Sequence, residues 1–540
     1  MSGAEAVLRA LRSMGVECIF ASPGSDWAPL WEALASDSYW FERYVSSRHE
    51  ETAIGMALGY AKATGKLPAV IVHTTVGALH TTMIARAALH ERIPMVILAG
   101  EVIGFGEPPA PKVGRQWLRL LTDLGGPARL MEGCVKWCMA LNTPDLLPHT
   151  LQRACQLAMS GPRGPVFVSV PTEYLLAEMR AEAPPAVLPS IPAVSDSALE
   201  EIAEFLQKAK SPVIITEEAG KDTAAVPALV ALAEALGAPV YEAWQPTYVN
   251  FPRRHPLYAG IVLEPEQIKD ADAVLLVEAV LPWHPPSALT DKKVLVLGED
   301  PLHPRLPYWG FRADVIGTGE VAPALHALAG KVKRKVSGEI FLRKRDQVKP
   351  GARIDTAWAA QSLNDVLPAG AIVVNETITH RPELQHHLDK LGPGSLFEAS
   401  YGGLGVGLGL ALGVKYAHPQ RTVVCTIGDG AFHYNPVIAS FGAAQEHKLP
   451  LLVVLFNNAG YLSQKRDVSN YYPQGAAARA GKVIGTSIMP PPRYPLLAQA
   501  YGGYGESVAS PADVRAALLR GLDAVSKGQL ALIEIELPPI

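Results

Sequence analysis

Short apolar runs alternate with stretches of helical apolar spacing from the first residues onward. Such runs predict strands at 16–20, 69–72 and 95–98. Apolar residues spaced three and four positions apart predict helices over 50–64 and 78–90. Short apolar strands separated by helices are typical of a parallel sheet that is covered on both faces. The first part of the chain is therefore expected to form an α/β domain.

The same alternation recurs twice after a proline-rich break. Segment 181–195, AEAPPAVLPSIPAVS, is predicted to be a linker, because its prolines lack backbone donors and disfavour helix. Further helices and strands are expected at 197–209, 213–216, 224–236, 273–277 and 293–297. The basic stretch 330–353 is interpreted as a solvated connector. Strands of a last unit are expected at 371–374, 422–427, 451–456 and 530–535.

The chain is thus predicted to fold as three doubly wound α/β domains with parallel sheets, over 1–180, 190–335 and 354–540. The first and third of these have similar length and element order. A chain of 540 residues agrees with this division, at roughly 100–200 residues per domain.

Composition excludes several classes of protein. A net charge of −4 gives no basic surface for nucleic acid or anionic lipid. No apolar stretch reaches the length of a membrane span, and the N-terminal segment lacks the basic and apolar parts of a signal peptide. Scattered cysteines predict reduced thiols and a cytoplasmic location rather than a disulfide framework or a metal site: Cys18, Cys134, Cys138, Cys155 and Cys425.

The strongest chemical signal is a pair of motifs in the last unit. Predicted strand 422–427 runs into Gly428-Asp429-Gly430, and strand 451–456 runs into Asn457-Asn458-Ala459-Gly460. The 26 residues from Ala431 to Phe456 separate them, which fits one strand–helix–strand crossover. Both motifs would then lie at the carboxyl ends of strands in one sheet, where open α/β sheets bind ligands.

The residue types at this edge suit a metal ion that holds a diphosphate. Mg²⁺ prefers hard oxygen ligands, which Asp429, Asn458 and the Gly460 carbonyl can offer. Glycine lets the backbone approach a diphosphate closely. Asp-Gly and Asn-Asn are also common turn pairs, so two ordinary turns remain the alternative. Their spacing favours the diphosphate–metal site.

Two further segments could complete that site. Thr377 and Thr379 follow strand 371–374 and could bind phosphate from the same sheet end. The glycine-rich stretch 401–409, YGGLGVGLG, precedes a helix, although close helix packing alone would explain it.

A carboxylate in the first domain is the second signal. Glu50 lies in Arg48-His49-Glu50-Glu51-Thr52-Ala53, at the start of a predicted helix. Taken alone, a glutamate in the first turn only complements the helix dipole, and the residues by themselves favour that explanation.

Together these motifs resemble the thiamine-diphosphate-dependent enzymes. GDG followed by NN is similar to their diphosphate signature, and HE(x)₃A with GYA-A-TG is similar to the region that supplies their activating glutamate. The resemblance implies that Glu50 bonds the aminopyrimidine of the cofactor and promotes loss of the thiazolium C2 proton. It also implies that Leu404 imposes the bent cofactor conformation.

The resemblance extends over nearly the whole chain and implies pyrimidine-binding, central and diphosphate-binding domains. It implies thiamine diphosphate and Mg²⁺ as cofactors, with Asp429, Asn458 and Gly460 as metal ligands. It further implies a homodimer at minimum, commonly a homotetramer, with the cofactor between two subunits. The expected cofactor-binding set is Glu50, Thr377, Thr379, Gly402, Gly403, Leu404, Gly428, Asp429, Gly430, Ala431, Asn458, Gly460 and Tyr461.

The reaction is not decided, because the sequence resembles two groups of enzymes that catalyse different reactions. Ser25 in FASPGS, His73 after an apolar strand and His284 in WHP resemble the active-site serine and histidines of benzoylformate decarboxylase. That pattern implies that the histidines handle protons and that Ser25 places the carboxylate of a 2-oxo acid. An unperturbed imidazole pKa of about 6.5 suits this task. For either histidine alone, a structural role is the simpler explanation.

Acetolactate synthase supplies the other pattern, through HEETAIGMALGYAKATG, IPMVILAGE and NFPRRHPLYAG. The chain departs from it after Asn458, where AGYLSQKRD lacks the tryptophan that synthases use to select the second 2-oxo acid. Glycine-rich flavin contacts are also missing, so bound FAD is not expected. The sequence thus predicts decarboxylation of a 2-oxo acid to an aldehyde, C–C carboligation, or both. A 2-hydroxyketone lyase and a catalytically silent regulatory relative remain alternatives.

Overall fold

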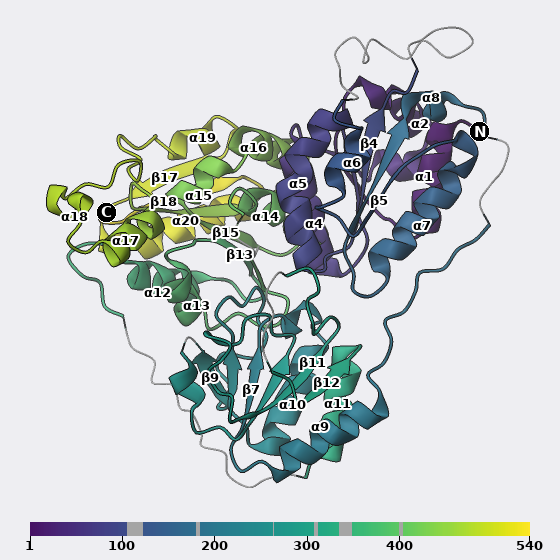
Figure 1. Ribbon diagram of the computed structural model, residues 1–540. Coiled ribbons are helices and arrows are strands. Elements are labelled where there is room, and N and C mark those ends of the chain that lie inside the picture. The colour runs from purple at the N-terminus through teal and green to yellow at the C-terminus, as the bar shows by residue number, and fades with distance from the viewer. Residues whose placement is uncertain are drawn as a thin grey trace.

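Three six-stranded sheets organise the described part of the chain in the computed structural model (Figure 1). The structure describes residues 1–104, 123–179, 184–262, 264–306, 312–333, 348–398 and 403–539. All strands within each sheet run parallel to their neighbours. The predicted fold class is therefore confirmed.

The first sheet and its helices draw on the N-terminal segment. Its strands are β1 (Ile19–Ser22), β2 (Tyr44–Ser46), β3 (Ala69–Val72), β4 (Met95–Glu101), β5 (Trp137–Ala140) and β6 (Pro165–Pro171). Its helices are α1 (Gly3–Ser13), α2 (Ala28–Ser36), α3 (Ser38–Phe41), α4 (Glu50–Thr64), α5 (Thr74–His90), α6 (Pro127–Met131), α7 (Leu147–Met159) and α8 (Thr172–Leu176), with short 3₁₀ turns η1 (Ser25–Trp27) and η3 (Pro144–Leu146).

The middle domain follows a stretch, 184–194, without regular structure. Its strands are β7 (Pro212–Thr216), β8 (Val240–Glu242), β9 (Tyr258–Ile261), β10 (Ala273–Val277), β11 (Lys293–Gly298) and β12 (Val315–Thr318). Its helices are α9 (Asp196–Lys208), α10 (Ala225–Leu236) and α11 (Val321–Lys331), with 3₁₀ turns η4 (Ala219–Lys221) and η5 (Pro265–Ile268).

The third domain is the richest in helices. Its strands are β13 (Ile372–Glu376), β14 (Leu396–Glu398), β15 (Val423–Gly428), β16 (Leu452–Asn457), β17 (Tyr504–Val508) and β18 (Ala531–Glu536). Its helices are α12 (Thr356–Val366), α13 (Arg381–His387), α14 (Gly407–Ala417), α15 (Asp429–Tyr434), α16 (Val437–Glu446), α17 (Leu462–Tyr471), α18 (Ala476–Ala480), α19 (Pro495–Gln499) and α20 (Val514–Ser526), with 3₁₀ turn η6 (Pro511–Asp513).

Strand order separates the middle domain from the other two. The first sheet runs β2-β1-β3-β4-β6-β5 and the third runs β14-β13-β15-β16-β18-β17, which is the same order. The middle sheet runs β9-β8-β7-β10-β11-β12, the order of dinucleotide-binding folds. In the middle sheet the chain reverses its direction of winding once, between β9 and β10, whereas in the first and third sheets it reverses twice. Ligand crevices open at the carboxyl ends of the strands at such points.

The crossover between the two glycine- and asparagine-containing motifs differs from the prediction of one helix. Strands β15 and β16 are parallel neighbours, as expected. The segment between them forms two helices, α15 and α16, because Pro436 interrupts the helical hydrogen bonds and α16 starts after it. Strand β1 also starts three residues later than predicted, where Ile19 pairs with Tyr44 and Ala69.

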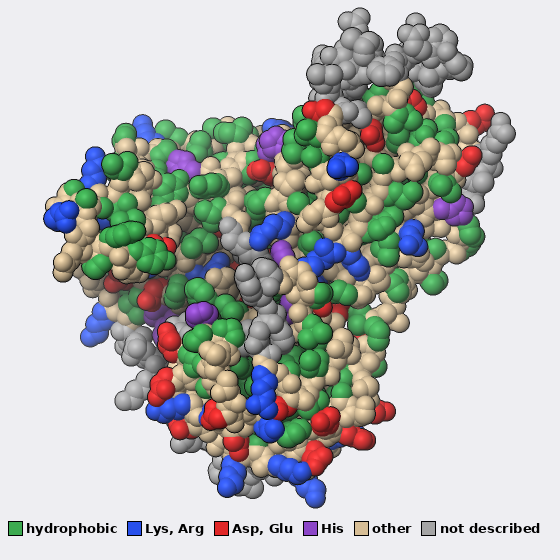
Figure 2. Space-filling model, in the orientation of Figure 1, with side chains coloured by type: hydrophobic (Ala, Val, Ile, Leu, Met, Phe, Trp, Pro, Cys, Tyr) green, Lys and Arg blue, Asp and Glu red, His purple; other side chains and the backbone are tan. Residues whose placement is uncertain are grey.

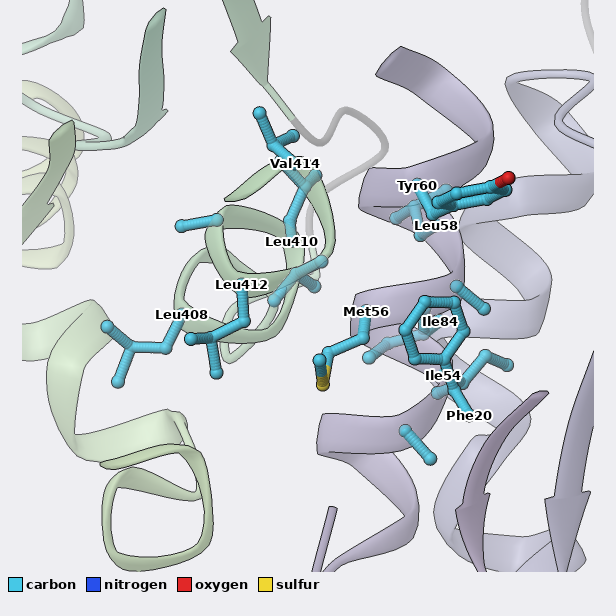
Figure 3. Close-up of a cluster of buried hydrophobic side chains, with 14 of the residues drawn as sticks. Phe20, Ile54, Met56, Leu58, Tyr60, Ile84, Leu408, Leu410, Leu412 and Val414 are labelled. Atoms are coloured by element: carbon cyan, nitrogen blue, oxygen red, sulfur yellow. The ribbon is translucent and has the colours of Figure 1, made fainter. Parts of the chain in front are cut away.

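Helices α4 and α14 join the first and third domains through a close backbone contact (Figure 3). A Cβ atom on Gly59 would lie 2.1 Å from the Leu410 carbonyl oxygen, and one on Gly413 would lie 1.9 Å from that of Met56. Glycine at these positions therefore permits the approach. Apolar side chains of both helices, with Phe20 on the first-domain side, form one continuous buried cluster around the contact.

Charged side chains of both signs are interspersed on the face that Figure 2 shows. That distribution agrees with the net charge of −4. Among the described helices, none combines the length and the apolar character that crossing a bilayer requires.

The helix contact predicts the effect of a single methyl group. Gly413→Ala should lower stability by about 1–3 kcal/mol, because the new Cβ would overlap the Met56 carbonyl and push α4 from α14. Gly330→Ala is the control, since a Cβ at Gly330 in α11 meets nothing within 4 Å. That change should be neutral or stabilising by about 0.5–1 kcal/mol. Thermal unfolding measures both, and equal midpoints for the two variants would contradict the packing argument.

Candidate active site

Three residues predicted to bind a metal ion meet at the carboxyl edge of the third sheet. Asp429 follows β15, and its carboxylate accepts hydrogen bonds from the backbone N–H groups of Gly430 and Gly460, both at 2.9 Å. The side-chain oxygen of Asn458 accepts from the same Gly460 N–H at 3.2 Å. We refer to Asp429, Asn458 and Gly460 as the Asp429 group.

Asp429 is only 3% exposed. Burial raises the pKa of its carboxyl to about 6, although the N–H groups of Gly430 and Gly460 act in the opposite direction. Among the described residues, no cationic side chain forms an ion pair with it. A bound cation would stabilise the ionised carboxylate, and the oxygen donors of the group are of the type that Mg²⁺ prefers.

His380 orients Asn458, and sequence reasoning did not identify it. Its Nε2 accepts from the side-chain nitrogen of Asn458 at 3.3 Å, and its Nδ1 lies 2.9 Å from the Thr356 hydroxyl. Burial lowers the pKa of His380 to about 4, so the ring is neutral at pH 7 and Nδ1 carries the proton. With its amide nitrogen bound to His380, Asn458 directs its oxygen toward Gly460. The only sequence signal was a histidine just after a strand.

The turn after β16 leaves room beside Asp429. Ala459 has φ +57°, and the Asn457 side chain accepts from its N–H at 2.9 Å, which stabilises the left-handed turn. A Cβ on Gly430 would lie 2.9 Å from the ring of Tyr461, whereas one on Gly428 would meet nothing within 4 Å. The backbone is thus packed at Gly430 and open at Gly428.

Glu376 holds the glycine-rich entry to α14. Its buried carboxylate accepts from the N–H groups of residues 405, 406 and 407 at 2.8 to 3.0 Å and from the Asn435 side chain at 2.7 Å. Burial raises its pKa, and these hydrogen bonds oppose that rise. Sequence reasoning selected Thr377 and Thr379 from this segment and missed the glutamate beside them.

The remaining predicted residues of this domain vary in placement. Thr377 is buried and donates its hydroxyl to Asn375 at 2.7 Å, so that hydroxyl is satisfied within the sheet. Thr379 is partly exposed, as are Gly403 and Leu404. Gly402 lies outside the described residues.

Glu50 is the first residue of α4 and is partly exposed. His49 caps the helix, and its Nδ1 accepts from the Glu51 N–H at 3.2 Å. His80, on α5, completes a cluster in which one ligand atom each of His49, Glu50 and His80 lies within 4.8 Å of the others. We refer to these three as the Glu50 group. Neither histidine was identified from the sequence.

Among the described residues, no hydrogen bond or ion pair joins the Glu50 group to the Asp429 group. The start of α4 instead lies against α16 of the third domain. Arg48 forms an ion pair with Glu446 at 3.0 Å, and the hydroxyls of Thr52 and Ser440 are 3.3 Å apart. One chain therefore presents the two groups separately.

His73 is held by a buried carboxylate. Its Nδ1 lies 2.6 Å from an oxygen of Asp26, which is 1% exposed and also accepts from the Thr74 N–H at 3.3 Å. Ser25, next to Asp26, is exposed. The structure thus brings Ser25 and His73 to one place. His284 is exposed in the middle domain, and among the described residues no hydrogen bond joins it to either one.

Comparison with known proteins identifies the family of the chain. Family models for the thiamine pyrophosphate enzymes match all three domains, as the N-terminal TPP binding domain over residues 1–111, the central domain over 199–304 and the C-terminal TPP binding domain over 379–535. The chain belongs to the thiamine pyrophosphate enzyme family. The predicted resemblance is confirmed, and the protein is a thiamine-diphosphate-dependent enzyme.

Curated members of the family differ in their reactions. The chain is 26% identical to acetolactate synthase isozyme 2 large subunit of Escherichia coli, over 96% of this chain and 93% of that one. It is 27% identical to benzoylformate decarboxylase of Pseudomonas aeruginosa, over 84% and 85%. The solved thiamine diphosphate-dependent 4-hydroxybenzoylformate decarboxylase of Rhodococcus jostii superimposes with a TM-score of 0.84 at 26% identity, covering 100% of both chains.

The geometry predicts a graded loss of metal-dependent cofactor binding in this family member. Asp429→Ala should abolish it, because the carboxylate that we expect to be a direct ligand is lost. His380→Ala should weaken it by about 10–100-fold, the usual effect of removing a residue that orients a ligand. Calorimetric titration with thiamine diphosphate, with and without Mg²⁺, measures both. Asp523→Ala, at an exposed ion pair with Lys527, is the control. Unchanged Mg²⁺ dependence in Asp429→Ala would refute the assignment.

Proposed function

We propose that this enzyme decarboxylates a 2-oxo acid to an aldehyde, using thiamine diphosphate and Mg²⁺. The observation that carries the proposal is the pair of Asp26 and His73 beside the exposed Ser25. After CO₂ has left, the former carbonyl carbon must take up a proton, and release of the aldehyde needs a base. An imidazole held by a buried carboxylate suits both steps. Ser25 is proposed to bind the substrate carboxylate.

The residues of the third domain fit the cofactor. Asp429, Asn458 and the Gly460 carbonyl would hold the Mg²⁺ ion against the diphosphate, in the space that Gly428 leaves open. Leu404 would support the bent conformation. Thiamine diphosphate supplies the carbon nucleophile and the electron sink that cleavage next to a carbonyl requires. Glu50 would share a proton with its aminopyrimidine ring.

A second copy of the chain is proposed to complete each site. Among the described residues of one chain, no hydrogen bond or ion pair joins the Glu50 group to the Asp429 group, although the cofactor needs both. A homodimer is therefore the minimum functional unit, and we propose a homotetramer as its natural extension. Five free cysteines support a reducing, cytoplasmic location.

The middle domain supports the expectation that no FAD is bound. A cavity of about 530 Å³ lies at the carboxyl ends of its strands, where its dinucleotide-type strand order would place a nucleotide. Its lining has more carboxylates than basic side chains, and this negative charge disfavours a bound phosphate group. The carboxylates are Glu218, Asp222, Glu278, Glu299 and Glu320, and the basic side chains are Lys62, Arg163 and Lys221.

Carboligation is the second candidate function. The similarity to acetolactate synthase over 96% of this chain supports it. Helix α17, LSQKRDVSNY, follows Asn458 and lacks the tryptophan expected of a synthase. Incubation with a panel of 2-oxo acids, with and without an acceptor aldehyde, decides between the two when CO₂ and products are both followed. A silent relative would produce neither.

Replacing Glu50 by glutamine tests its role directly. Glu50→Gln should fold and bind the cofactor, but exchange of the cofactor C2 hydrogen should slow by about 10²–10⁴-fold, because an amide cannot share the proton. NMR-detected exchange in D₂O measures this rate. Glu51→Gln is the matched control on the next residue of α4. A wild-type exchange rate in Glu50→Gln would leave Glu50 as a helix-start residue only.

The Asp26–His73 pair predicts that its variants slow the steps after substrate addition and leave cofactor binding unchanged. With an accepted 2-oxo acid, His73→Ala should slow the steps after substrate addition by about 10²-fold or more. Asp26→Asn should slow the same steps and change their pH profile, while cofactor affinity stays unchanged. His284→Ala tests the more distant histidine in the same rapid-mixing assay. Wild-type rates of addition, decarboxylation and release in the His73 and His284 variants would favour a carboligase or lyase instead.

A further inference from the structure

Arg92 is a buried arginine, and some of its N–H donors have no acceptor among the described residues. It follows α5 at the junction of the first and middle domains and is only 3% exposed. Its Nη2 contacts carboxylates of Glu218 at 2.5 Å and Glu278 at 2.6 Å. Its Nε and Nη1 have no hydrogen-bond partner among the residues that the structure describes. Three of the five N–H donors of a guanidinium are therefore unsatisfied.

Such a group calls for an acceptor. Buried polar atoms in folded proteins are almost always hydrogen-bonded, and charged donors are the least tolerant of isolation. A cavity of about 320 Å³ lies against Arg92, between the two domains. Its walls come from the end of α5, from Lys136 and Arg163 of the first domain, and from the loop 300–306 after β11. The cavity shares no residue with the Asp429 group or the Glu50 group.

The lining of this cavity is basic. Its charged side chains are Arg92, Lys136, Arg163 and Arg305 against the single carboxylate of Asp300. The Nε of Arg163 is also buried without a partner among the described residues. Figure 2 shows Lys and Arg side chains gathered where the first domain meets the middle domain. This excess of basic side chains contrasts with the excess of carboxylates in the cavity of about 530 Å³ at the middle domain.

Burial shifts the pKa values of two titratable groups around the cavity, and neighbouring arginines act in the same direction. Burial lowers the pKa of Lys136 to about 8, and Arg305 contributes in the same direction while Glu299 opposes it. Burial lowers the pKa of His303 to about 4, with Arg92 the next contribution. In both cases the arginines contribute less than burial does, and only their contribution would also stabilise an anion.

We propose that this cavity is a binding site for a small metabolite with an oxyanionic group, either a phosphate or a carboxylate. The Nη1 N–H groups of Arg92, which have no partner among the described residues, would donate to an oxygen of the anion, and Arg305 would face it from the rim. A volume of about 320 Å³ holds a small ligand, since ligand pockets begin near 300 Å³. Because its walls belong to two domains, an occupant would strengthen their junction.

Binding of inorganic phosphate and of malonate tests the site in the full-length protein. Thermal unfolding and calorimetry at constant ionic strength, set with NaCl, are expected to show saturable binding and a rise in Tm. A response to phosphate alone identifies a phosphate site, and one to malonate alone a carboxylate site. Neither response, or a crystal structure grown with phosphate that shows only water at Nε and Nη1, would overturn the proposal.

Two variants separate binding from folding. Arg92→Lys keeps a cation for Glu218 and Glu278 but lacks the Nη1 donors, so it should fold and lose affinity. Arg305→Glu leaves the buried cluster intact and should weaken binding by about tenfold, equivalent to about 1.4 kcal/mol. Arg479→Glu, on exposed α18, makes the same charge change elsewhere and should bind as wild type. Wild-type affinity in both Arg92→Lys and Arg305→Glu would also overturn it.

Discussion

The contact between α4 and α14 fixes the relation of the two cofactor-binding domains. Because Gly59 and Gly413 bring the helix backbones together, neither helix can slide or rotate without a clash. Each helix begins at a group of functional importance, α4 at Glu50 and α14 at the loop that Glu376 holds. One apolar interface therefore determines where both groups face. It also explains why α4 is buried nearly all round, with weak amphipathic character.

The three sheets use their carboxyl edges in different ways. The first and third share one strand order, yet one presents Glu50 after β2 and the other presents Asp429 after β15. The middle sheet has dinucleotide-type order but carries carboxylates where phosphate would lie. Fold alone does not assign these chemistries, because the side chains at the strand ends decide them. Family membership identifies the cofactor as thiamine diphosphate, whereas the reaction depends on the residues around that cofactor.

Much of this architecture could be predicted from local patterns. Helix α4 and strands β3 and β10 match the predicted ranges to the residue, because apolar periodicity and terminal glycines are local signals. Two of the residues that were missed, His380 and Asp26, are buried polar groups whose partners lie far away in the chain. His380 acts through Asn458, 78 residues on, and Asp26 acts through His73, 47 residues on. No local sequence pattern predicts such pairs, because only the tertiary fold brings their members together.

Two buried carboxylates at one sheet edge illustrate how the fold separates structural from functional acids. A carboxylate has about four lone-pair positions. Glu376 fills its positions with three backbone N–H groups and the Asn435 amide, so it has no capacity for a further ligand. Asp429 accepts hydrogen bonds from the backbone N–H groups of Gly430 and Gly460, and its own N–H and that of Ala459 contribute less. Burial raises the pKa of both acids, but only Asp429 has lone pairs left for a cation. On the ground of hydrogen-bond capacity, rather than burial or charge, we therefore propose Asp429 and not Glu376 as the metal ligand.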